Sequence, residues 1–83
     1  MKITIQKTEE LFKNHISDFK VGDTITGDLE DDRIKEDFPV IINNGVYSNG
    51  KSFQGQTYLC QKVNKIIDEE YFQSSFCIYK IIT

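Results

Sequence analysis

Strict alternation of apolar and polar residues is the feature that most constrains how this chain folds. Residues 1–6 alternate without a break, and residues 24–30 repeat the pattern with Ile25 and Leu29 on the apolar side. Successive side chains of a β-strand point to opposite faces, so this period predicts two strands that each have one buried face. Gly27, inside the second strand, predicts a bulge or a close approach of two backbones.

A different pattern follows the first strand. Thr8 is a suitable helix N-cap, and Glu9 and Glu10 would occupy the first turn, where the helix dipole favours negative charge. The residues that would form one apolar helical face are Leu11, Phe12, His15, Ile16 and Phe19. The sequence therefore predicts a helix from Glu9 to Phe19 that ends before Gly22.

Three further segments have clear preferences. Residues 40–42 are β-branched and predict a short inner strand. Two Asn-Gly pairs within residues 43–55 predict turns. Residues 46–48 are either a very short strand between these turns or part of one wide loop anchored by Tyr47 and Phe53, and we expect the loop. Residues 76–82 are rich in strand formers and predict a central last strand.

Residues 58–71 are ambiguous, because apolar residues at helical spacing occur among residues with strand preference. The strand alternative uses Asp68 to Glu70 as a turn and predicts a β-α-β-β-β-β order, with a small antiparallel curled sheet or partly open barrel and one N-terminal helix. The helix alternative predicts the β-α-β-β-α-β order of a split βαβ sandwich. Both belong to the α+β class, and residues 1–83 are expected to form a single domain.

Composition excludes several classes of protein. The chain has 83 residues, no apolar run long enough for a membrane helix, and no apolar segment of the signal-peptide kind at its start. We therefore expect a cytoplasmic protein without a membrane partner. Cys60 and Cys77 are too few for a disulfide framework, and we expect two thiols in a reducing compartment.

No residue pattern indicates catalysis or a cofactor. The one histidine, His15, is not tied by spacing to Cys60, Cys77 or a serine, and nucleophilic catalysis usually needs such a base. Zinc sites need three or four ligands at short spacings, which one His and two distant Cys do not supply. We expect a protein that is not an enzyme and that has no cofactor and no metal site.

The net charge is −3, and most of the excess acid lies between Asp28 and Asp37, where six acidic residues accompany two basic ones. Three interpretations stay open for this cluster: a solvated edge that discourages aggregation, a surface that docks on a basic partner, or a Mg²⁺ or Ca²⁺ site. The spacing matches no calcium loop. No basic stripe exists, so nucleic-acid binding through phosphate contacts is not expected.

Residues of the acidic cluster and of the 43–55 loop form the predicted partner-binding set. Its members are Asp28, Glu30, Asp31, Asp32, Glu36, Asp37, Tyr47, Asn49 and Phe53. We expect the partner to be another protein with a basic binding surface, and the length of the chain is compatible with a homodimer. In an alternative hypothesis, Tyr47, Phe53 and Tyr58 stack on the bases of an RNA or a nucleotide.

Residues 18–25, with the sequence DFKVGDTI, resemble a phrase of small β-barrels of the PUA/ASCH type, and residues 63–67 followed by 76–78 resemble a barrel-closing hairpin. The resemblance implies a barrel associated with RNA or modified nucleosides. The family usually carries a glycine, lysine and glutamate group soon after its first helix. No glycine occurs between Met1 and Val21, so no catalytic residue is carried over.

The chain is rich in Ile, Lys and Asn and has no alanine, a bias that resembles accessory proteins of viruses and mobile elements of low-GC bacteria. Together with the small size, this predicts a non-catalytic binding protein that acts through protein–protein contact, such as a phage inhibitor of a host defence enzyme. The alternative is an RNA- or nucleotide-binding barrel of the PUA/ASCH type.

Overall fold

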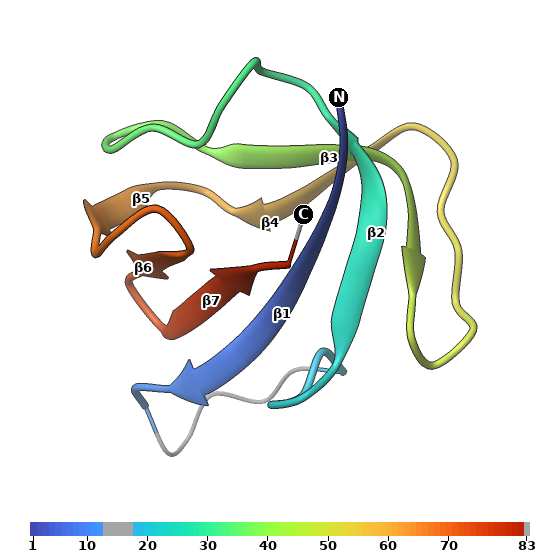
Figure 1. Cartoon of the computed structure of the whole chain (residues 1–83). Coiled ribbons are helices and arrows are strands. Elements are labelled where there is room, and N and C mark those ends of the chain that lie inside the picture. Colours follow the sequence, from blue (N-terminus) through green and yellow to red (C-terminus); the bar gives the residue numbers. More distant parts are fainter. Residues whose placement is uncertain (13–17, 83) are drawn as a thin grey trace.

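A computed structural model describes residues 1–12 and 18–82, which form one antiparallel sheet of seven strands (Figure 1). The strands are β1 (Lys2–Glu10), β2 (Thr24–Leu29), β3 (Val40–Tyr47), β4 (Gln56–Cys60), β5 (Val63–Ile66), β6 (Tyr71–Ser74) and β7 (Cys77–Ile81). Their order in the sheet is β4-β3-β2-β1-β7-β6-β5. The two outermost strands, β4 and β5, are consecutive in the sequence, so the sheet must curl to bring them together.

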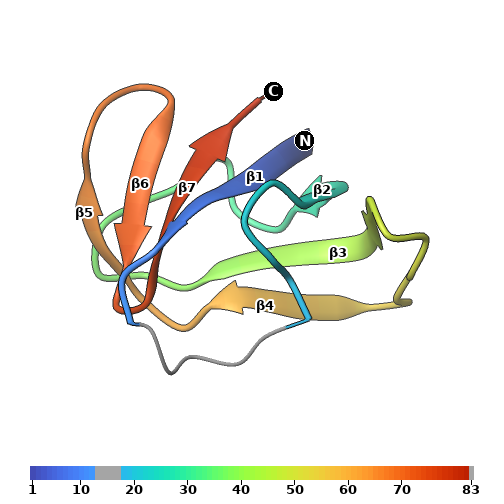
Figure 2. The same cartoon turned by 90° about the horizontal axis from the view of Figure 1, so that it is seen from below.

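The curl is visible in both views of the fold, in which the sheet wraps around a central core (Figures 1 and 2). The connection between β2 and β3 helps to close it. The amide of Asp37 donates to the carbonyl of Val63 at 2.8 Å, and the amide of Val63 donates to the carbonyl of Phe38 at 2.9 Å. The outer side of β5 is therefore paired, and the sheet forms a partly open barrel.

The interior of the barrel is filled by residues from the inward faces of the strands. Its buried apolar members are Ile3, Ile5, Phe19, Ile25, Leu29, Val40, Ile42, Val63, Phe72, Cys77 and Tyr79. The strands predicted at the start of the chain and at residues 24–30 are confirmed, because their apolar faces are the buried ones. A chain this short buries little surface, so its core depends on strands that each place their apolar face inside.

Two glycines allow β2 and β3 to approach closely at a bulge. A Cβ on Gly27 would lie 2.5 Å from Cγ2 of Ile42 and 2.8 Å from the carbonyl oxygen of Asn43. A Cβ on Gly45 would lie 2.8 Å from Cδ1 of Ile25. The β2–β3 register shifts at this point. The prediction that Gly27 marks a bulge or a close backbone approach is confirmed.

The predicted α+β class is wrong, because the described residues are all-β and contain no helix. Glu9 and Glu10 belong to β1, where they pair with Ile78 and Cys77 of β7. The hydroxyl of Thr8 donates to the carbonyl of Ile78 at 3.0 Å instead of capping a helix. Pairing with a distant strand thus outweighs the local helical pattern. The described residues accordingly include no helix that could cross a membrane.

Residues 13–17, and with them His15, lie outside the described residues. Beyond them, residues 20–23 form a turn in which the amide of Asp23 donates to the carbonyl of Lys20 at 2.9 Å. Gly22 adopts a φ of 96° at this turn, a conformation that glycine adopts without strain. Of the described part of the predicted helix, Glu9 and Glu10 are strand, and residues 18 and 19 form a bend that leads into this turn.

The split βαβ alternative is also wrong, because residues 58–71 contain the end of β4, all of β5 and a turn. Ile67, which would lie on the apolar helical face, is 42% exposed. The carboxylate of Asp68 accepts hydrogen bonds from the amides of Glu70 at 2.8 Å and Tyr71 at 3.0 Å. This side-chain contact with the following backbone stabilises the predicted turn between β5 and β6.

The wide loop predicted for residues 43–55 is shorter than expected, because β3 continues to Tyr47. Asn44 follows the bulge with a φ of 53°, so the first Asn-Gly pair lies inside a strand and does not form a hairpin turn. The second pair does form a turn, since the amide of Gly50 donates to the carbonyl of Tyr47 at 3.0 Å.

Candidate functional site

Among the described residues, the outer side of β4 is the free edge of the sheet. The other outermost strand, β5, is covered by the β2–β3 connection through Asp37 and Phe38. Outside the strand ladders, no hydrogen bond within the described residues reaches the backbone of Tyr58, at the centre of β4. An edge of this kind presents unpaired amide and carbonyl groups that can pair with another chain.

The register shows which backbone groups point outward. The carbonyl of Ile41 accepts from Glu30 on the β2 side at 3.0 Å, so the backbone groups of Ile41 face away from β4. Ile41 lies opposite Tyr58 in the β3–β4 pair. Because paired residues in an antiparallel ladder alternate between bonded and non-bonded pairs, the amide and carbonyl of Tyr58 point away from β3 and toward the free edge.

The sequence of β4 lacks the residues that usually protect an edge strand. Gln56–Cys60 contains no charge and no proline, whereas lysine and proline are the common means of preventing strand addition. The Tyr58 side chain is 57% exposed. β4 is therefore an edge that is chemically open to pairing.

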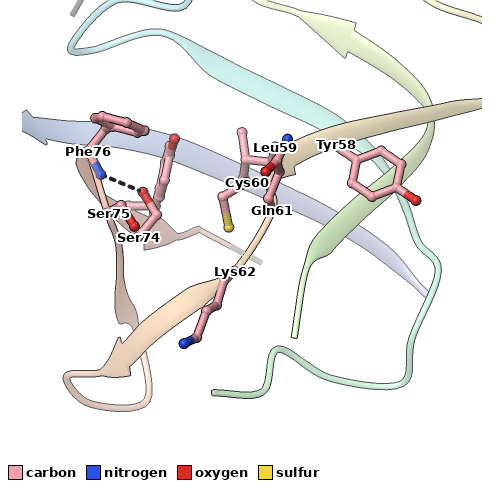
Figure 3. Close-up of a pocket in the computed structure, with 9 residues that line it drawn as sticks. Tyr58, Leu59, Cys60, Gln61, Lys62, Ser74, Ser75 and Phe76 are labelled. Carbon is pink, nitrogen blue, oxygen red and sulfur yellow. Dashed lines mark hydrogen bonds between the residues drawn. The ribbon is translucent and has the colours of Figure 1, made fainter. Parts of the chain in front are cut away.

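A pocket of about 420 Å³ lies between the end of β4 and the turn that joins β6 to β7 (Figure 3). Its walls come from β4 and the two residues after it, and from the β6–β7 turn and β7. The lining residues are Tyr58, Leu59, Cys60, Gln61, Lys62, Ser74, Ser75, Phe76 and Tyr79. A volume of this size accepts one large side chain or a small ligand.

The thiol of Cys60 and the phenol of Tyr79 give the pocket its chemistry. Figure 3 shows the Cys60 sulfur lying between β4 and the β6–β7 turn. Burial raises the pKa of the Cys60 thiol, and the amides of Val40 and Lys62 oppose this only in part. Burial, and next the neighbouring Cys77, raise the pKa of Tyr79 well above its ordinary range. Both groups therefore stay neutral at physiological pH, which suits binding better than nucleophilic attack.

The hydroxyl of Ser74 is used within the β6–β7 turn. It accepts a hydrogen bond from the amide of Phe76 at 3.4 Å (Figure 3). It also accepts one from the amide of Cys77 at 3.2 Å and donates to the carbonyl of Cys77 at 3.3 Å. These contacts fix the turn that forms one wall of the pocket. Ser74 thus shapes the site and does not supply a free nucleophile.

Exposed aromatic side chains flank the pocket. Phe76 is 49% exposed and packs edge-to-face on Phe12, with ring centroids 5.5 Å apart. The amide of Leu11 donates to the carbonyl of Phe76 at 2.7 Å, so the end of β1 holds this pair in place. Partly exposed aromatics beside a pocket are typical anchors of protein–protein contacts.

Asp28 lies in β2, and the other predicted acidic residues lie along the β2–β3 connection, where several have structural partners. Glu30 accepts hydrogen bonds from the side-chain amide of Gln56 at 2.9 Å, and Glu36 accepts one from the amide of Ile66 at 3.1 Å. Asp37 lies 3.5 Å from Lys62.

The other three acidic residues, Asp28, Asp31 and Asp32, are exposed. Among the described residues, no three His, Cys, Asp or Glu side chains gather closely enough to hold a metal ion. The cluster therefore divides into carboxylates that stabilise loops and carboxylates that face solvent.

The other predicted residues lie at the opposite end of β2. Ser48 is hydrogen-bonded to Thr24 at the start of β2, through its amide at 2.9 Å and its hydroxyl at 3.1 Å, whereas the acidic connection leaves β2 after Leu29. Tyr47 and Phe53 pack together with ring centroids 5.5 Å apart, and Asn49 is exposed in the turn beside them. The structure therefore does not bring the two halves of the predicted site together.

The β4 edge and its pocket are the part of the site that sequence reasoning missed. The uncharged character of residues 56–60 is visible in the sequence. Its significance depends on the strand order, which no local pattern reveals. Comparisons with protein-family models, with curated proteins and with solved structures found no match.

Proposed function

We propose that this chain is a non-catalytic binding protein of the cytoplasm, and that an extended segment of a partner protein adds to the sheet along β4. The observation that supports this most directly is the outward direction of the Tyr58 backbone on an edge without charge or proline. Strand addition is a recurring mode of peptide recognition in which main-chain hydrogen bonds give affinity and adjacent pockets give specificity.

The pocket beside β4 supplies the specificity in this proposal. A strand laid along β4 places alternate side chains on the side of the pocket, where Leu59, Phe76 and Tyr79 provide apolar surface. Cys60 adds a neutral thiol. The pocket therefore favours a large apolar side chain over a charged one.

The exposed carboxylates add an electrostatic preference to the proposal. Asp31 and Asp32 are exposed on the β2–β3 connection, and the chain carries a net charge of −3. Complementary charge chiefly accelerates encounter and selects between partners. A partner with a basic surface around its extended segment fits this arrangement.

A pair of variants at one position tests strand addition. Tyr58→Pro removes the amide that points to the free edge and leaves the β3–β4 ladder intact, because proline is tolerated where its nitrogen faces away from the sheet. Tyr58→Val is the matched control, since it loses the same aromatic ring and keeps the amide. Both are used as immobilised baits with cell lysate beside the wild-type chain, and bound proteins are identified by mass spectrometry.

We expect partners that bind wild type and Tyr58→Val and are lost with Tyr58→Pro. Hydrogen exchange on a purified complex should then show new protection of the Tyr58 amide. If both variants capture the same partner proteins equally well and exchange at Tyr58 does not change, the proposal is wrong. Sedimentation of the isolated chain is the companion measurement, because a dimer abolished by Tyr58→Pro would replace the foreign partner with a second copy of this chain.

A further inference from the structure

A second cavity, distinct from the β4 pocket, lies where the start of β2 meets the hairpin after β3. Its volume is about 220 Å³, below the range of sites that enclose drug-sized ligands. The lining residues are Asp18, Phe19, Tyr47, Asn49, Lys51 and Phe53. Three aromatic rings and a carboxylate thus surround a space suited to one small group.

The ring of Tyr47 stands nearly perpendicular to that of Phe19 and to that of Phe53. Tyr47 packs edge-to-face on Phe19, with centroids 5.3 Å apart and planes at 74°, and on Phe53, with centroids 5.5 Å apart and planes at 84°. Rings at right angles form the walls of a box, whereas parallel rings would form a single flat platform. Aromatic boxes of this kind are the usual receptors for quaternary ammonium groups.

Two of the three walls are held rigidly by the core. Phe19 is 9% exposed and stacks on Tyr79 with centroids 6.3 Å apart. The amide of Tyr47 donates to the carbonyl of Lys51 at 2.8 Å across the hairpin. Burial raises the pKa of Tyr47, so its ring stays a neutral phenol. The third wall, Phe53, is 46% exposed and borders the opening.

The opening carries one charge of each sign, so the aromatic rings decide which ion the cavity favours. The Asp18 carboxylate is 89% exposed and lies 3.3 Å from the Lys51 ammonium group, which is itself 56% exposed. Ring faces carry the negative end of the aromatic quadrupole and attract cations. Phe19 already contacts the Lys7 ammonium group and stacks on Tyr79, so Tyr47 and Phe53 supply the faces for a further cation. A phosphate would meet both this carboxylate and the negative ring faces, with one exposed lysine to offset them.

We propose that this cavity binds a methylated ammonium group. A trimethylammonium group has no N–H to satisfy and is weakly hydrated, so it gains more from aromatic walls than it loses in hydration. Lys51 then competes with the ligand, because its ammonium group already pairs with the Asp18 carboxylate at the opening. The same chemistry is presented by a choline headgroup and by a trimethylated lysine side chain.

Titration of the whole chain with tetramethylammonium, followed by NMR, tests the proposal. We expect saturable shifts for residues 47–53. Phe53→Ala should weaken binding about fivefold, while Phe38→Ala, which removes a comparably exposed ring from the β2–β3 connection, should leave it unchanged. Asp18→Asn should weaken binding, and Lys51→Gln should strengthen it.

Parallel titrations distinguish the two sources of the group. Stronger binding of choline assigns the cavity to a headgroup or a free metabolite, and stronger binding of N-ε-trimethyllysine assigns it to a modified protein. Adenosine monophosphate is the opposing probe. If it saturates the cavity and Lys51→Gln weakens that binding, the site is a nucleotide site and the proposal is wrong. Absence of tetramethylammonium shifts at about 10 mM would also overturn it.

Discussion

The ammonium group of Lys7 lies 2.7 Å from a carboxylate oxygen of Glu10, although only 1% of the Lys7 side chain is exposed. Lys7 also donates to the carbonyl of Phe19 and lies 5.5 Å from the centroid of the Phe19 ring. One buried cation thus joins β1 to the segment that returns toward β2. A buried charge needs such partners, because an unpaired one is strongly destabilising.

Glu10→Gln should lower the free energy of unfolding by about 2 kcal/mol, because it leaves the buried Lys7 ammonium without its counter-charge. The value lies below that for a fully buried pair, since the Glu10 side chain is 25% exposed. Urea unfolding measures it, and Glu9→Gln, at the exposed neighbour, is the control. Combining Glu10→Gln with Lys7→Met should restore part of the loss. Equal effects of Glu9→Gln and Glu10→Gln would show that the pair does not stabilise the fold.

The partners of residues 8–10 explain why the helix from Glu9 to Phe19 was wrongly predicted. Glu9 and Glu10 suit the first turn of a helix by local rules, and Thr8 suits its cap. In the fold, Glu10 neutralises Lys7 and Thr8 bonds to the carbonyl of Ile78. Lys7 and Glu10 are only three residues apart, but the bond of Thr8 and the pairing of Glu9 and Glu10 with β7 depend on residues about 70 positions away, which a local pattern does not contain.

Other parts of the fold were predictable because they depend on nearby residues. Alternation marks β1 and β2, and the composition of residues 76–82 marks β7. The Asp68 turn and the Gly27 bulge follow from side-chain chemistry and from the absence of a side chain. The free β4 edge was not predictable, since it exists only because β4 and β5 end the strand order.

Gly27→Ala should destabilise the fold by about 2–3 kcal/mol, the upper range for overpacking a core. The new Cβ would meet Cγ2 of Ile42 at 2.5 Å and a backbone oxygen at 2.8 Å, and backbone yields less readily than a side chain. Gly45→Ala should cost less, because its closest contact is the terminal methyl group of Ile25. Thermal and urea unfolding rank the two variants. A larger loss of stability for Gly45→Ala than for Gly27→Ala would contradict this prediction.

Charge reversal at Asp31 and Asp32 should slow association with a basic partner and flatten its salt dependence, while dissociation changes little. Neither carboxylate is ion-paired in the described part of the chain, so stability should stay within about 0.5 kcal/mol of wild type. Surface plasmon resonance at several salt concentrations, with a partner identified through β4, gives both rates. Reversal of Glu69, which is exposed in the turn between β5 and β6, is a control that alters charge elsewhere. Unchanged association would leave Asp31 and Asp32 with no role beyond solubility.

Tyr79 should make the fold sensitive to alkali. Burial, followed by the adjacent Cys77, raises its pKa above the ordinary 10.0, so the folded chain holds a proton that the unfolded chain releases. A group whose pKa is raised on folding contributes stability that is complete below its unfolded pKa and is lost as pH rises past it. The free energy of unfolding should therefore fall above about pH 10, by up to ~1.4 kcal/mol per pH unit for this proton.

Tyr79→Phe should reduce that slope. It should also cost about 1 kcal/mol at neutral pH, because it removes the hydrogen-bond interactions of the phenol with the Cys77 and Ser74 side chains. Urea unfolding between neutral pH and pH 11 measures both effects, and Tyr58→Phe controls for loss of a phenol at an exposed position. A slope that is the same in wild type and Tyr79→Phe would mean that Tyr79 keeps an ordinary titration despite its burial.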